Sequence, residues 1–262
     1  MTILDKIVEN KKIEIERAKE SISLESLEKS LLFNRKTNSL TATLNTPTST
    51  GIIAEYKRKS PSKGDINIGA GVAEVTHGYA QAGAAALSVL TDTLFFGGFK
   101  EDLQIAREKN PLTPILRKDF MVDEYQIYEA KAWGADLILL IAACLSPKEI
   151  EKFGKKAHEL GLEVLLEVHD KEELARSPLE FVDLVGVNNR NLKNFNENNV
   201  NASLELTDLI PANKIKISES CISQPETIRL LKSAGYQGFL IGENFMKTNN
   251  PAKAFADFVQ NI

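Results

Sequence analysis

The sequence contains few of the residues that bind structural metals or form disulfides. Among its 262 residues there are two cysteines, Cys144 and Cys221, and three histidines, His77, His158 and His169. Two cysteines cannot build a disulfide framework or a four-cysteine metal centre. The histidines lack the H-E-x-x-H spacing of a zinc site. We therefore expect no metal and no other cofactor.

Long apolar runs and a basic character are also missing. The longest apolar run extends only from Leu137 to Leu145, whereas a membrane-spanning helix needs roughly 18–20 residues. Charged residues begin at Asp5, before any apolar run develops, so we expect no signal peptide. The net charge of −4 is unlike the basic footprint of most nucleic-acid-binding proteins. These absences predict a cytoplasmic protein without a membrane or nucleic-acid partner.

The N-terminal region is expected to be a helical extension. An apolar stripe on Ile3, Ile7 and Val8, with charges on the opposite face, predicts helix within the first 36 residues. A second short helix is expected from about Leu24 to Phe33. Residues 37–50, TNSLTATLNTPTST, are rich in Ser, Thr and Asn and predict a connector or a loosely packed loop.

From Gly51 onward, short apolar strand-like runs alternate with amphipathic helical stretches. The predicted strands are 51–57, 85–90, 114–120, 136–142, 163–169, 183–189, 214–220 and 238–243. This alternation predicts a parallel sheet with helical crossovers, closed into a (β/α)8 TIM barrel. A doubly wound open sheet is the alternative, although no G-x-G-x-x-G follows the first strand. We expect a single domain, with residues 1–50 as extension and linker and 51–262 as barrel.

Several predicted helices have start signals in the sequence. Ser146, followed by Pro147 and Glu149, matches a capping box with proline in the first turn. The pair Ser223 and Glu226 has the same spacing, and Asp170 with Glu173 is a close variant.

Polar residues cluster where the predicted strands end, which is where such barrels place their active sites. These residues are Glu55, Lys57, Lys118, Asp119, Glu167, Asn188, Arg190, Ser218, Glu219, Ser220, Gly242 and Glu243. Because alternate strand residues share a direction, Glu55 and Lys57 face the same side. Burying them there is costly unless they are paired or belong to a solvated site. A structural ion pair is the alternative to a catalytic role.

The last two units are candidates for binding a phosphate group. In such barrels, phosphate is often held by the loops after strands seven and eight. Here those loops contain SESC (218–221) and IGEN (241–244), and Arg190 could add a guanidinium.

Two further features are ambiguous. His169 could act as an acid or base, but we expect it in the loop before the Asp170 cap. Phe95, Phe96 and Phe120 follow strands two and three, where they either pack in the core or contact a planar substrate.

Six motifs resemble one family, indole-3-glycerol-phosphate synthase of tryptophan biosynthesis. They are IAEYKRKSPSKG (53–64), LRKDF (116–120), LLEVHD (165–170), GVNNRNL (186–192), ISES (217–220) and FLIGE (239–243). They span the predicted barrel in order, and the N-terminal extension also fits the family. The resemblance implies ring closure of 1-(2-carboxyphenylamino)-1-deoxyribulose 5-phosphate to indole-3-glycerol phosphate, with loss of CO2 and water. It implies a small phosphorylated substrate as partner, in a monomer or a weak homo-oligomer.

The resemblance also implies catalytic roles. Lys118 matches the general acid of ring closure, and Lys57 matches the lysine that holds the substrate carboxylate. Glu167 and Glu55 match two glutamates that serve the dehydration as base and acid. Asn188 matches a hydrogen-bonding residue that positions them.

Substrate binding is implied for a second group of residues: Ser60, Phe96, Phe120, Arg190, Ser220, Cys221, Gly242 and Glu243. The two phenylalanines match the wall around the aromatic ring. Arg190, Gly242 and Glu243 match the phosphate end, with Glu243 contributing its backbone N–H because its carboxylate repels phosphate. Cys221 departs from the glycine usual in the family and could crowd the phosphate. Residues 58–65 resemble a mobile lid.

Two other functions remain as alternatives. A phosphoribosylanthranilate isomerase needs a Cys/Asp acid–base pair, but Cys144 and Cys221 follow the fourth and seventh strands rather than an early one. A catalytically silent barrel that binds a phosphorylated ligand would be expected to lack Lys118, Glu55 or Glu167, and the sequence contains all three.

Overall fold

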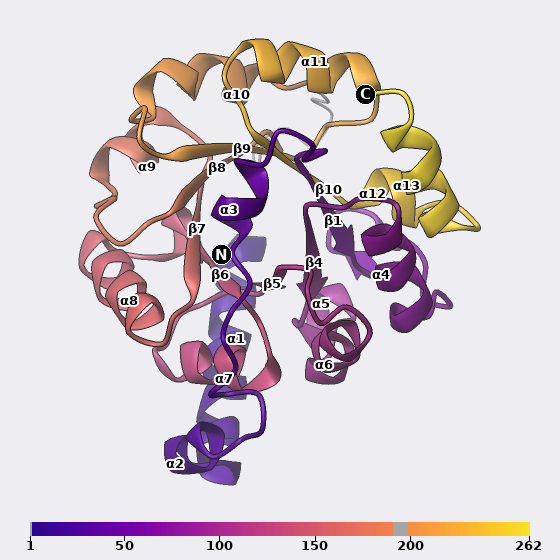
Figure 1. Cartoon of the computed structure of the whole chain (residues 1–262). Helices are drawn as coiled ribbons and strands as arrows, with labels where there is room; N and C mark the ends of the chain where they lie inside the picture. Colours follow the sequence, from indigo (N-terminus) through magenta and orange to yellow (C-terminus); the bar gives the residue numbers. More distant parts are fainter. Residues whose placement is uncertain (1, 191–198) are drawn as a thin grey trace.

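The structure is a computed structural model that describes residues 2–190 and 199–262. Its central element is a closed barrel of parallel strands (Figure 1). In the order of the barrel they are β1 (Ile52–Tyr56), β4 (Ala86–Leu90), β5 (Ile115–Lys118), β6 (Leu137–Ile141), β7 (Glu163–Val168), β8 (Leu184–Asn188), β9 (Ile215–Glu219) and β10 (Gly238–Ile241), which pairs with β1. The predicted (β/α)8 barrel is confirmed, and the open-sheet alternative is wrong.

Helices surround the barrel and connect successive strands (Figure 1). The longer ones are α4 (Val72–Gln81), α6 (Lys100–Lys109), α7 (Tyr125–Trp133), α8 (Pro147–Glu159), α9 (Lys171–Arg176), α10 (Asn201–Leu206), α11 (Pro225–Ser233) and α13 (Pro251–Val259). Short elements follow the ends of several strands: α5 (Thr93–Phe96), η1 (Ala142–Cys144), α12 (Glu243–Met246) and a hairpin of β2 (Lys59–Ser60) and β3 (Gly64–Asp65). The short helix η2 (Thr207–Leu209) directly follows α10.

Two of the three predicted helix starts are confirmed. Ser146 and Glu149 form the capping box of α8, and the Asp170 carboxylate accepts the N–H of Glu173 at the start of α9. The predicted cap at Ser223 is wrong, since α11 begins at Pro225 with Gln224 as its N-cap. A residue before proline is pushed into an extended conformation, and Gln224 has φ −128° and ψ 145°.

Leucine and isoleucine side chains from alternate strand positions fill the barrel. Ile53, Leu116, Leu165, Leu184 and Ile217 belong to this interior cluster, while their strand neighbours pack outward against the helices. Strands buried on both faces account for the nearly continuous apolar runs in the sequence.

Residues 37–50 are predicted as a connector or a loosely packed loop, and the loosely packed loop is wrong because the segment contains α3 (Leu40–Leu44). Leu40 and Leu44 join the interior cluster and close the barrel at the amino ends of its strands (Figure 1). The helix start is held by Glu163, the first residue of β7, whose carboxylate accepts the Leu40 N–H at 2.8 Å. The Ser39 and Thr41 hydroxyls donate to the same carboxylate.

The predicted N-terminal helices form as α1 (Ile3–Ser21) and α2 (Leu24–Glu28), although the second ends earlier than expected. Ile15 and Leu27 pack against Tyr125 and Ala132 of α7 in a separate apolar cluster. The extension is therefore attached to the outside of the barrel through the helix that follows β5.

A buried lysine fixes α1 to the barrel. The Lys11 ammonium lies 2.9 Å from Asp92 and 3.0 Å from Asp119, which follow β4 and β5, and 2.6 Å from Glu14. Burial alone lowers the pKa of Lys11, but the charges of Asp119 and Asp92 more than compensate and raise it. Lys11 therefore stays charged, and each partner offsets the cost of burying the others.

We expect Lys11→Met to lower the free energy of unfolding by about 3 kcal/mol, because it leaves Asp92 and Asp119 buried without their shared cation. Lys19→Met is the matched control on the same helix. Lys19 pairs with Asp123 and Glu16 at the surface, so its loss should cost less than about 1 kcal/mol. Urea titration of both variants measures the difference, and equal losses would contradict this role for Lys11.

Candidate active site

A pocket of about 640 Å³ lies at the carboxyl ends of the barrel strands. Every catalytic or substrate-binding residue implied by the family resemblance lines it: Glu55, Lys57, Ser60, Phe96, Lys118, Phe120, Glu167, Asn188, Arg190, Ser220, Cys221, Gly242 and Glu243. Their shared location follows from strand alternation. Glu55, Lys118 and Glu167 each come two residues after an interior residue of their own strand, at Ile53, Leu116 and Leu165.

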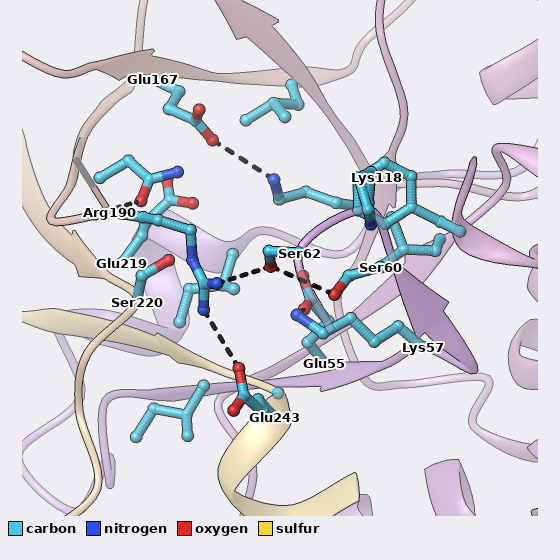
Figure 2. A pocket seen from close by; sticks show the side chains of 18 of the residues that line it. Glu55, Lys57, Ser60, Ser62, Lys118, Glu167, Arg190, Glu219, Ser220 and Glu243 are labelled. Atoms are coloured by element: carbon cyan, nitrogen blue, oxygen red, sulfur yellow. Dashed lines mark hydrogen bonds and ion pairs between the residues drawn. The ribbon is translucent and has the colours of Figure 1, made fainter. Parts of the chain in front are cut away.

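Two ion pairs occupy the centre of the pocket (Figure 2). The Lys118 ammonium lies 3.3 Å from a Glu167 carboxylate oxygen, and the Lys57 ammonium lies 2.6 Å from Glu55. Both lysine side chains are 16% exposed and both glutamate side chains 5%. Pairs with so little solvent are screened weakly, so the charge of each group strongly affects its neighbours.

The electrostatics assign different protonation states to the pocket groups. Burial opposes the charge on Lys118, but Glu167 and neighbouring carboxylates raise its pKa above the usual value. Burial likewise opposes the charge on Glu167, yet Lys118 and His169 lower its pKa. Burial and the charge of Glu167 raise the pKa of Glu219 to about 8. The pocket thus combines an ammonium and a carboxylate with a second carboxyl group, Glu219, that burial and the charge of Glu167 bias toward its protonated form.

Glu219 was counted among the strand-end residues but left out of the predicted site. Its side chain points into the pocket beside Glu167 (Figure 2), and it is 1% exposed. Within the described residues its Oε1 has no hydrogen-bond partner. Gly186 makes room for it, since a Cβ there would lie 2.2 Å from that oxygen. The alternation of side chains along the strand could have identified Glu219 as a pocket residue, because it follows interior Ile217 by two residues.

Asn188 connects the carboxylate cluster to the loop after β8. Its side-chain oxygen accepts the backbone N–H of Arg190 at 3.0 Å, which leaves its amide group to donate. A hydrogen bond from Asn188 contributes to the lowered pKa of Glu167. Asn188 therefore stabilises the ionised form of that carboxylate.

A second charged cluster lies where the phosphate was predicted. Arg190 donates to the Glu243 carboxylate at 3.1 Å and to the Ser62 hydroxyl at 2.8 Å (Figure 2). Lys63 lies 3.4 Å from the other Glu243 oxygen. The Glu243 carboxylate thus pairs with both cationic side chains of this cluster, Arg190 and Lys63. The resemblance implies only the backbone N–H of Glu243 as a contact for the phosphate.

The segment predicted as a lid, residues 58–65, contains the β2–β3 hairpin. At its tip, Ser62 contacts Arg190 and Lys63 contacts Glu243. Its first residue, Arg58, binds the other side of the pocket. Arg58 pairs with Asp102 of α6 and donates to the Gly97 carbonyl at 3.0 Å. The hairpin therefore bridges the pocket from α6 to the Arg190 cluster.

The aromatic wall forms as expected from two of the three phenylalanines. The rings of Phe96 and Phe120 lie 5.9 Å apart with an interplanar angle of 38°, and both line the pocket, whereas Phe95 does not. Sequence reasoning missed the contribution of α1, whose residues Ile3, Leu4 and Ile7 also line the pocket. No local signal identifies them, because the contact depends on how α1 docks.

Ser220 and Cys221 have an unusual backbone conformation. Their φ values are 66° and 59°, in the left-handed region that disfavours residues with a Cβ. The glycine usual at position 221 in the resembling family has no such cost. Cys221, which departs from the family pattern, therefore places backbone strain directly beside the candidate phosphate site.

We expect Cys221→Gly to be about 1 kcal/mol more stable than Cys221→Ala, because only the glycine variant relieves the left-handed φ. Both variants lose the thiol, so its contact 3.8 Å from the Asn189 carbonyl does not affect the comparison. Urea unfolding of the two proteins provides the test. If the alanine variant proved equally stable, position 221 would carry no backbone strain.

In residues 2–190 and 199–262, no group of three or more His, Cys, Asp or Glu side chains is arranged to hold a metal ion. Among the same residues, no helix is long and apolar enough to cross a membrane.

Comparison with known proteins gives consistent results. The family described as indole-3-glycerol phosphate synthase matches residues 4–258. An indole-3-glycerol phosphate synthase of Bacteroides thetaiotaomicron is 46% identical, with 99% of this chain and 98% of that protein covered. One of Acinetobacter baumannii is 50% identical, covering 78% of this chain and 76% of its own.

Solved structures with low sequence identity share the fold. The crystal structure of 3-hexulose-6-phosphate synthase from Salmonella typhimurium superposes with a TM-score of 0.65 at 12% identity. It covers 80% of this chain and 97% of its own. At this identity the likeness concerns the barrel alone.

Proposed function

The chain belongs to the indole-3-glycerol phosphate synthase family, and from this premise we propose how its pocket residues divide the work of the reaction. The enzyme is a carboxy-lyase of tryptophan biosynthesis that acts on 1-(2-carboxyphenylamino)-1-deoxyribulose 5-phosphate. A carbon–carbon bond forms between the aromatic ring and the ketone carbon. The carboxylate then leaves as CO2, the hydroxyl leaves as water, and indole-3-glycerol phosphate remains.

We propose Lys118 as the general acid of ring closure. As the ring carbon attacks the ketone, negative charge develops on the ketone oxygen and must be neutralised by a proton. The observation that carries this assignment is the buried Lys118 ammonium, 3.3 Å from Glu167 in the centre of the pocket. Its raised pKa keeps it protonated, and the low solvent exposure strengthens its interaction with the developing charge.

We propose that Lys57 holds the substrate carboxylate until it leaves as CO2. Its pairing with Glu55 at 2.6 Å orients the ammonium at the side of the pocket opposite Glu167 (Figure 2). In this arrangement Glu55 acts mainly by holding Lys57. The resemblance implies Glu55 as an acid in the dehydration, but the raised pKa of Glu219 supports Glu219 in that role.

For the dehydration we propose Glu167 as the base and Glu219 as a proton donor. The lowered pKa of Glu167 keeps it able to accept a proton from carbon, and Asn188 supports that ionised state. The pKa of Glu219, about 8, leaves it protonated at neutral pH and able to assist departure of hydroxide as water.

We propose that the substrate phosphate binds between Arg190 and the loops of Ser220, Cys221 and Gly242, while Ser60 adds a polar contact. Arg190 currently pairs with the Glu243 carboxylate. A phosphate would replace that carboxylate as its partner, leaving the Glu243 backbone N–H as the contact. The aromatic ring would lie against Phe96 and Phe120.

The two alternative functions have less support. The isomerase needs a reactive cysteine, but burial raises the pKa of the Cys144 thiol to about 12. A silent barrel does not explain why Lys118, Glu55 and Glu167 are all retained in one pocket.

We also propose that the chain works in the cytoplasm as a monomer or a weak homo-oligomer that binds no nucleic acid, in keeping with its net charge of −4. The Lys11 contacts with Asp92 and Asp119 support one folding unit for the extension and the barrel.

Replacing the proposed acid gives the most direct mutational test. We expect Lys118→Ala to lower kcat by about 10²–10⁴-fold, the usual contribution of a general acid, while circular dichroism shows the fold intact. Lys216→Ala is the control, since Lys216 on β9 donates to the Thr207 carbonyl at 2.6 Å and does not line the pocket. Unchanged turnover in Lys118→Ala would exclude the assigned role.

The phosphate assignment predicts a change in KM rather than kcat. Arg190→Met should raise KM about 10-fold or more, as expected for losing a charge-assisted hydrogen bond. Glu243→Gln should lower KM, because its side chain no longer competes with phosphate for Arg190. Steady-state kinetics with the natural substrate distinguish these outcomes. A defect of Arg190→Met confined to kcat would contradict the assignment.

A further inference from the structure

His169 lies between two carboxylates at the edge of the pocket. It follows β7 two residues after Glu167, and its side chain is 15% exposed. Its Nε2 is 3.5 Å from a Glu167 oxygen, and its Nδ1 is 3.2 Å from Glu173. The roles proposed above for the reaction do not use this histidine.

Glu173 is held in a fixed position beside the ring. The same Glu173 oxygen that faces Nδ1 accepts the backbone N–H of His169 at 2.8 Å. The backbone N–H of Glu173 donates to the Asp170 carboxylate at 2.9 Å, at the start of α9. The carboxylate facing Nδ1 is therefore part of the local fold rather than a mobile surface group.

An imidazole with a carboxylate at each nitrogen can donate to both only in its protonated form. The geometry of His169 thus favours the imidazolium, whose positive charge in turn favours an ionised Glu167. Although burial opposes this charge, the Glu173 and Glu167 carboxylates raise the pKa of His169 above its usual value.

Charged groups on the other packed elements act on the same pair. In its ionised form Glu219 on β9 raises the pKa of His169 further, whereas Lys118 on β5 contacts the other Glu167 oxygen. The Cys144 thiol of η1 stays neutral, because burial raises its pKa. Glu167 is therefore placed between two cations, Lys118 and His169, with Glu219 as a competing carboxyl group.

We propose that His169 is a positioning residue that, supported by Glu173, holds Glu167 as an oriented and ionised base facing Lys118. This inference rests on the proposed role of Glu167 in the dehydration. Without His169, Lys118 and the hydrogen bond from Asn188 would have to keep Glu167 ionised against the cost of its burial. His169, held by Glu173, supplies a second cation beside the Glu167 oxygen that Lys118 does not contact.

The electrostatic interaction of His169 with Glu167 and Glu173 can be measured without following the reaction. With only three histidines in the chain, NMR titration of the imidazole C–H signals resolves His169 by its loss in His169→Gln. We expect its pKa to lie above 6.5 in the wild type and to fall by about one unit in Glu173→Gln and in Glu167→Gln. A His169 pKa at or below 6.5, or one unmoved by Glu167→Gln, would overturn the inference.

The consequence for catalysis is a shift in the pH profile. In His169→Gln the pKa of Glu167 rises, so the acid limb of kcat/KM should move upward by about one pH unit. A purely structural role would lower the whole profile without moving its limb, and that result would also overturn the inference. His158→Asn is the matched control, because His158 pairs with Asp183 at 2.9 Å outside the pocket.

Turnover by the Glu167 and His169 variants distinguishes the role of the base from that of the residue that positions it. Full turnover by Glu167→Gln would overturn the proposed base, and with it the positioning role of His169. Loss of turnover in Glu167→Gln together with an unmoved acid limb in His169→Gln would overturn the His169 inference alone.

Discussion

The structure depends on compensating charges that the barrel removes from water. Lys118 and Glu167 come from β5 and β7, Lys57 and Glu55 from the end of β1, and all four project into one pocket. An isolated buried charge would cost several kcal/mol, so each ion pair is tolerable only because its partner is present. The same closeness sets the protonation states that the chemistry needs. Stability of the pocket and competence for proton transfer therefore have one physical origin.

The same principle attaches the N-terminal extension. Lys11 of α1 is buried between Asp92 and Asp119, and Asp119 directly follows Lys118 in the chain. The last residue of β5 and the residue after it thus bind different partners: Lys118 pairs with Glu167 in the pocket, and Asp119 pairs with Lys11 of α1. Because α1 also lines the pocket with apolar side chains, its attachment through Lys11 links the position of the extension to the shape of the substrate site.

Much of this could be predicted from the sequence, because barrel strands have a regular alternation and their carboxyl ends meet in one place. Glu55, Lys118 and Glu167 were identified in this way together with a specific family resemblance. Features that depend on contacts between residues distant in the sequence could not be predicted. The polar composition of residues 37–50 predicts a connector or a loosely packed loop, whereas the structure has α3 there. The contacts that stabilise this helix are distant in the sequence, because Leu40 packs in the barrel interior and Glu163 accepts the Leu40 N–H. The ion pair between Arg190 and Glu243 depends on side-chain packing that local sequence does not encode.

The central claim is that this cluster of buried charges closes an indole ring with loss of CO2 and water. It is tested most directly by mixing the purified chain with 1-(2-carboxyphenylamino)-1-deoxyribulose 5-phosphate while recording indole fluorescence and released CO2 together. The account predicts that both rise at the same rate and in equal amounts until the substrate is consumed. A folded protein that binds the substrate yet yields neither indole fluorescence nor CO2 would contradict it.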